Sequence, residues 1–142
     1  MNDALRQLYQ DVIVHHHKSP RNYGPLAGAT HEATMVNPLC GDEVTLRLQL
    51  DGDRISALRF ESRGCVLSRA AASLMTEAVL GKTLDEALAV GRELETFVSA
   101  PPAPGAAERL GALTALEGVR DYPSRVVCVT LAWQALALAR RQ

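Results

Sequence analysis

The alternation of apolar and polar residues between positions 44 and 50 constrains the fold most strongly. The apolar members are Val44, Leu46, Leu48 and Leu50, and the polar ones are Thr45, Arg47 and Gln49. This period of two predicts a β-strand with one buried face. Asp51-Gly52 follows at once as a hairpin signal, so the chain from Arg54 to Glu61 should return as a second strand. With a short strand at Glu32 to Asn37, we expect an antiparallel sheet of about three strands.

Most of the remaining sequence predicts helices. Apolar residues at spacings of three and four indicate an amphipathic helix over residues 3–17. Ser68 is expected to cap a helix that ends at Gly81. Thr83 and Glu86 form a capping-box pattern for a helix from Leu84 to about Leu94. Further predictions are short helical turns over 106–117 and a last helix capped by Ser124. The expected fold is a single α+β domain over residues 1–142, with the sheet packed against helices.

Composition and charge exclude several classes of protein. The 142 residues carry a net charge of −1, and the lysines and arginines are scattered. Nucleic-acid and membrane-surface proteins instead concentrate basic charge, so neither class is expected. The first thirty residues have no apolar core of the signal-peptide type, so we expect a cytoplasmic protein. Three cysteines are an odd number, and in a reducing compartment thiols more often bind metal or react than form disulfides.

The segment Asn37-Pro38-Leu39-Cys40-Gly41-Asp42 is the candidate functional loop. Pro38 interrupts regular structure and Gly41 allows a tight turn, so Cys40 and Asp42 should lie together on a bent loop. A thiolate and a carboxylate are half of a tetrahedral zinc site. Cys65 and Cys128 can complete it if the fold brings them there. Both lie near predicted helix starts, where the helix dipole should lower the thiol pKa. A cysteine taken singly is more simply a buried apolar residue.

Several motifs together resemble one protein family. They are Leu8-Tyr9, Val12-Ile13, His16, Lys18, Pro20-Arg21-Asn22, Asn37-Pro38-Leu39-Cys40-Gly41-Asp42, Asp51-Gly52, Gly64-Cys65, and the segment from Pro123 to Cys128. In this order they resemble the IscU, NifU N-terminal domain and SufU family of iron–sulfur cluster assembly proteins. The resemblance covers nearly the whole chain. It implies a SufE/NifU-like fold and a metal site made from Cys40, Asp42, Cys65 and Cys128.

Within this family the sequence is most similar to the SufU type. Val127 stands where IscU-type scaffolds have a histidine before the last cysteine, and Tyr122 to Val126 replaces their Leu-Pro-Pro-Val-Lys chaperone motif. The resemblance therefore implies a zinc-dependent sulfur carrier, sulfurtransferase-like and not a stand-alone enzyme. A SufS-type cysteine desulfurase would supply persulfide sulfur to Cys40. Downstream iron–sulfur assembly proteins are the other expected partners.

Two other functions use the same residues. A scaffold could assemble a 2Fe-2S cluster on the three thiols, with Asp42 as the labile ligand. A purely structural zinc module is the third alternative, although such sites usually contain paired short spacings that this chain lacks. His15-His16-His17 does not add a metal site, because consecutive helical residues point about 100° apart. We expect His16 alone to face inward.

Overall fold

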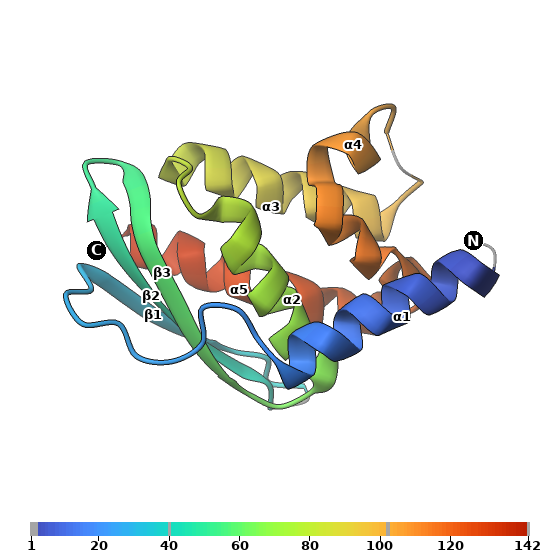
Figure 1. Cartoon of the computed structure of the whole chain (residues 1–142), viewed down its shortest axis with the longest axis horizontal. Coiled ribbons are helices and arrows are strands. Elements are labelled where there is room, and N and C mark those ends of the chain that lie inside the picture. Colours follow the sequence, from blue (N-terminus) through green and yellow to red (C-terminus); the bar gives the residue numbers. More distant parts are fainter. Residues whose placement is uncertain (1–2, 40, 102, 142) are drawn as a thin grey trace.

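The computed structural model describes residues 3–39, 41–101 and 103–141 and has the predicted α+β architecture (Figure 1). Helix α1 (Asp3–Lys18) precedes three strands, β1 (His31–Val36), β2 (Glu43–Asp51) and β3 (Arg54–Arg63). Then follow α2 (Val66–Val79), α3 (Leu84–Ser99), α4 (Ala106–Leu110), two 3₁₀ segments, η1 (Gly111–Asp121) and η2 (Pro123–Arg125), and α5 (Val126–Arg140). In the part of the chain that the structure describes, no helix combines the length and apolar character that crossing a bilayer requires.

The sheet is antiparallel throughout, in the order β1-β2-β3. The alternation in β2 has the predicted consequence, since Val44, Leu46 and Leu48 are fully buried. Leu46 pairs with Phe60 of β3, which is also fully buried. Helices α2 and α5 contact the sheet, and all helices lie on one side of it in Figure 1. The core therefore lies between the sheet and these two helices.

The opposite face of the sheet is polar. Arg47 in the central strand forms ion pairs with Glu61 of β3, at 2.6 Å, and with Glu32 of β1, at 3.6 Å. Thr34 and Thr45 hydrogen-bond across the β1–β2 pair at 2.8 Å. Cross-strand polar pairs of this kind stabilise a solvated sheet face. One face is thus apolar and the other polar, as the period of two in the sequence indicates.

Several predicted helix boundaries need correction. Helix α2 begins at Val66 with Cys65 as its N-cap, and not at a Ser68 cap. Ser124 does not cap the last helix, because η2 occupies residues 123–125 and runs directly into α5. Helix α3 continues five residues beyond Leu94, since Phe97 and Val98 are still buried in the core. The capping box of Thr83 and Glu86 is confirmed.

Helix α1 is fastened to α2 by a buried polar contact. His16 is 7% exposed, and its Nδ1 lies 2.7 Å from the hydroxyl of Ser73, which also accepts the backbone N–H of Arg21 at 2.8 Å. Glu77 lies 3.5 Å from the other ring nitrogen. His16 therefore faces inward as expected, and every polar atom at this contact has a partner, as buried polar groups require.

Candidate metal centre

Asp42 stands at the end of the β1–β2 connection and is 1% exposed. The backbone N–H of Asn37 donates to the carbonyl of Asp42 at 2.7 Å, and that of Gly41 donates to the carbonyl of Asn37 at 2.8 Å. The side chain of Asn37 also accepts the backbone N–H of Leu39 at 3.1 Å. These bonds fix both sides of the loop, which explains why Asp42 has a defined position. Cys40, the predicted sulfur acceptor, lies outside the described residues.

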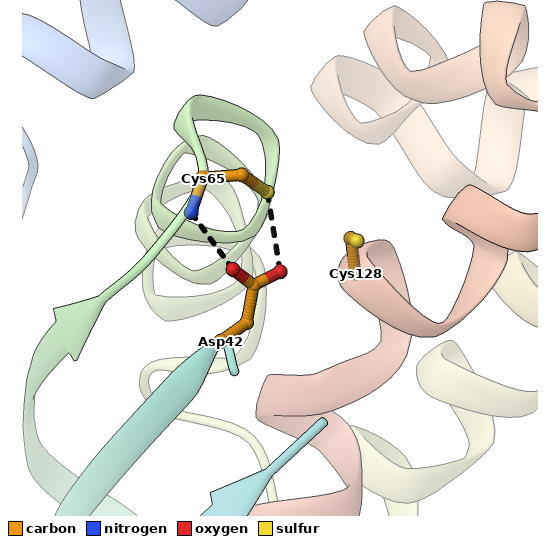
Figure 2. Close-up of side chains that lie close together, drawn as sticks. All are labelled: Asp42, Cys65 and Cys128. Carbon is orange, nitrogen blue, oxygen red and sulfur yellow. Dashed lines mark hydrogen bonds between the residues drawn. The ribbon is translucent and has the colours of Figure 1, made fainter. Parts of the chain in front are cut away.

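Cys65 meets the Asp42 carboxylate through both its backbone and its side chain (Figure 2). Its backbone N–H donates to Oδ1 at 2.8 Å, and its thiol donates to Oδ2 at 3.2 Å. As the N-cap of α2, Cys65 also accepts the backbone N–H of Ser68 on its sulfur, at 3.3 Å. The Cys65 sulfur therefore lies at the N-terminus of α2, beside the Asp42 carboxylate.

Cys128 reaches the same point from the third residue of α5 and is 5% exposed. The ligand atoms of Asp42, Cys65 and Cys128 all lie within 4.8 Å of one another. A tetrahedral zinc ion with bonds of about 2.0–2.3 Å separates its ligands by roughly 3.3–3.8 Å, so a small inward movement would suffice to bind one. The structure thus brings together three of the four predicted ligands, from a strand end, a helix cap and a second helix.

The electrostatics of the three groups also suit a cation. Burial, the Asp42 hydrogen bond and the nearby Cys65 thiol raise the pKa of Cys128 to about 12. The expected lowering by the helix dipole is therefore wrong for Cys128, because burial and the acidic neighbours outweigh it. Without a positive charge, this cluster cannot hold all its members ionised. A divalent cation would remove that conflict, so two thiols and a carboxylate suit zinc.

The raised pKa makes the stability of the metal-free protein pH-dependent. Between about pH 9 and 12, the folded protein retains the Cys128 proton that the unfolded chain releases, so the free energy of unfolding should fall as pH rises. Denaturant titrations of metal-free protein at a series of pH values measure this slope. The slope should flatten in Cys128→Ala, which lacks the titrating group. An equal slope in both proteins would contradict the assignment.

Gly64 is a site residue that the sequence prediction did not assign a role. A Cβ on Gly64 would lie 2.1 Å from Oδ1 of Asp42, so no larger residue fits beside the carboxylate. The position of Gly64 directly before Cys65 is visible in the sequence, but the sequence does not reveal that Gly64 contacts Asp42.

The sequence profile of the NifU-like N-terminal domain matches residues 8–129, most of the chain. The chain belongs to the NifU-like N-terminal domain family. This match includes the positions of Cys40, Asp42, Cys65 and Cys128.

Three similar proteins illustrate the range of this NifU-like family. The zinc-dependent sulfurtransferase SufU of Bacillus subtilis is 39% identical over 95% of this chain and 90% of its own length. The iron–sulfur cluster assembly scaffold protein IscU of Streptococcus pyogenes is 41% identical over 93% and 82%. A protein of Fervidobacterium islandicum, proposed as a SUF-system assembly scaffold, superposes with a TM-score of 0.84 at 32% identity, covering 94% and 97%. The NifU-like fold is therefore shown by sequence and by structure.

Proposed function

We propose that this protein is a zinc-dependent sulfur acceptor in iron–sulfur cluster assembly, taking persulfide sulfur from a SufS-type cysteine desulfurase. The observation that carries the proposal is the convergence of Asp42, Cys65 and Cys128 within 4.8 Å. Similarity to the zinc-dependent sulfurtransferase of Bacillus subtilis supports it. The protein acts as a carrier, with the desulfurase and downstream assembly proteins as partners in the cytoplasm.

Cys40 is the proposed fourth ligand and the sulfur-accepting residue. It lies two residues from Asp42, and two residues of chain span at most about 7 Å, so chain connectivity keeps it near the cluster. Cys40, Asp42, Cys65 and Cys128 would hold Zn²⁺, which supplies a redox-inactive positive charge that keeps thiols deprotonated. Cys65 and Cys128 are anchored on helices, whereas Cys40 belongs to a connection between strands. The loop cysteine is thus the one best suited to reach a partner.

The transfer step is thiol exchange. The Cys40 thiolate attacks the outer sulfur of the desulfurase persulfide, and a new S–S bond forms at Cys40. The S–S bond of the donor breaks, and its cysteine leaves as a thiolate. The outer sulfur atom is transferred from the desulfurase cysteine to Cys40 with no net oxidation, so no external oxidant or reductant is needed.

Mass-spectrometric mapping of persulfide tests the assignment. The purified protein is incubated with the desulfurase and cysteine, alkylated, and digested. We expect an added sulfur on the peptide that contains Cys40, and none when cysteine is omitted. Label on Cys65 or Cys128, with Cys40 unmodified, would refute the role of Cys40.

Exposed apolar side chains flank the site and suit a protein partner. Leu39, beside Cys40 in sequence, is 87% exposed; Val66, beside Cys65, is 45% exposed; and Tyr122, just before η2, is 64% exposed. Exposed large apolar side chains are typical of protein interaction sites when they form a patch. Tyr122 also lines a cavity of about 510 Å³, together with Leu67 and Arg125. We propose that the desulfurase docks here.

Leu39→Asp should weaken desulfurase docking by at least about tenfold, because a charge replaces an apolar contact residue at the interface. The measurement is the concentration of this protein that half-maximally stimulates sulfide release. Leu80→Asp is the matched control, since Leu80 is also exposed but lies at the far end of α2, about 22 Å away along the helix. Zinc content should stay unchanged in both variants. Equal docking by both variants would contradict the proposed surface.

The scaffold function remains the second candidate, and the similarity to IscU of Streptococcus pyogenes favours it. In that case the same residues would carry a 2Fe-2S cluster as cargo. Anaerobic incubation with iron and sulfide separates the two functions. A stable visible absorption and transfer of the cluster to an acceptor protein would support the scaffold. The sulfur-carrier proposal predicts neither.

A further inference from the structure

Gly64 lies where β3 turns into α2, pressed against Asp42. A Cβ added to Gly64 would lie 2.1 Å from Oδ1, and 2.9 Å from both Cγ and Cα of Asp42. Contacts under 3.0 Å require movement, and rotation of the Asp42 side chain alone cannot relieve the overlap with its backbone. Gly64 also has φ +121°, in the region that side chains disfavour. Both constraints make this position specific for glycine.

The space left by Gly64 lets the next residue hold the carboxylate. The backbone N–H of Cys65 donates to Oδ1 at 2.8 Å, which fixes one oxygen of Asp42. Cys65 is itself fixed as the N-cap of α2, since its carbonyl accepts the hydroxyl of the buried Ser68 at 3.2 Å. The orientation of the carboxylate therefore follows from the start of the helix.

The other oxygen, Oδ2, is the one that faces the thiol of Cys65, at 3.2 Å, on the side of Cys128 (Figure 2). We infer that Gly64 is a positioning residue of the metal centre, which makes Asp42 a ligand through Oδ2 alone. One-oxygen binding suits a four-coordinate zinc ion, whereas two-oxygen binding suits ions with six to eight ligands. The inference rests on the proposed function only in requiring that the site bind metal.

Gly64→Ala tests the inference, with Gly24→Ala as the matched control. Gly24 has nearly the same φ, +124°, but an added Cβ there meets nothing within 4 Å. Both variants thus place a side chain at a positive φ, and the clash with Asp42 belongs to Gly64→Ala alone. Zinc affinity is measured by competition with a chromophoric chelator, and thermal unfolding of the metal-free proteins checks the fold.

We expect Gly64→Ala to bind zinc about 10–100-fold more weakly than the natural protein, the usual effect of losing a group that orients a ligand. Gly24→Ala should bind within about threefold. With Co²⁺ as a probe, the visible ligand-field bands should shift in Gly64→Ala and not in Gly24→Ala. The inference would be overturned if Gly64→Ala bound zinc as tightly as the natural protein and had an unshifted Co²⁺ spectrum. It would also be overturned if Gly64→Ala and Gly24→Ala lost zinc affinity equally.

A second measurement does not depend on the folding of Gly64→Ala. Hydrogen exchange at the Cys65 amide should be slow in the natural metal-free protein and much faster in Asp42→Ala, which lacks the acceptor. Unchanged exchange would overturn the inference. Neither readout involves sulfur transfer, so a protein that passes these tests but accepts no persulfide would refute the proposed function and leave this inference standing.

Discussion

Replacing Cys40 by Ser should lower the stimulation of desulfurase sulfide release by this protein at least about a hundredfold. A hydroxyl is almost wholly protonated at neutral pH and is a far weaker nucleophile toward sulfur than a thiolate. Mass spectrometry should then find no persulfide on the Cys40→Ser protein. Sulfide release should stay at the rate of the desulfurase alone.

Cys65→Ser is the control for Cys40→Ser, because it also removes a proposed ligand but keeps the loop thiol. If Cys40 accepts the sulfur, the persulfide that Cys65→Ser still forms should lie on residue 40, in an amount that falls with the zinc content of the variant. Full stimulation by Cys40→Ser, with the added sulfur on another cysteine, would contradict the assignment of the acceptor.

Asp42→Ala should weaken zinc binding by at least about a hundredfold. The substitution removes a proposed ligand and also leaves the Cys65 N–H, which donates to Oδ1, without its acceptor. An unsatisfied buried donor costs about 1–3 kcal/mol, so the α2 start should loosen as well. Chelator competition measures the affinity, and the rate of zinc release measures the loosening.

Asp42→Asn separates the two roles of the carboxylate. Its amide oxygen can still accept the Cys65 N–H, but the side chain has no charge. We expect an affinity between those of the natural protein and Asp42→Ala. The pKa of Cys128 should also fall from about 12, since the Asp42 carboxylate is one of the groups that raise it. Natural zinc affinity in Asp42→Ala would exclude Asp42 as a ligand.

Much of the fold could be predicted from local patterns because they have local causes. The alternation from Val44 to Leu50 follows from the burial of one sheet face, and the Asp51-Gly52 turn fixes the partner strand. The capping box of Thr83 and Glu86 is likewise contained within four residues. Helix ends were less predictable, because burial of Phe97 and Val98 extends α3 beyond the point that its sequence pattern indicates.

The candidate site required more than local patterns. Asp42 and Cys65 are 23 residues apart, and no periodicity in the chain predicts that they touch. The family resemblance provided that pairing, and the structure shows three of the four residues together. The contact between Gly64 and Asp42 and the raised pKa of Cys128 depend on burial and distances across elements. These properties emerge only when the strands and helices are packed.

X-ray absorption at the zinc edge of the purified protein identifies the atoms that surround the metal. We expect one zinc per chain, bound by three sulfurs at about 2.3 Å and one oxygen at about 2.0–2.2 Å. Asp42→Ala should lose that oxygen or the metal. A zinc ion surrounded by nitrogen and oxygen alone, or a protein that binds no zinc, would contradict the proposed site of three cysteines and Asp42.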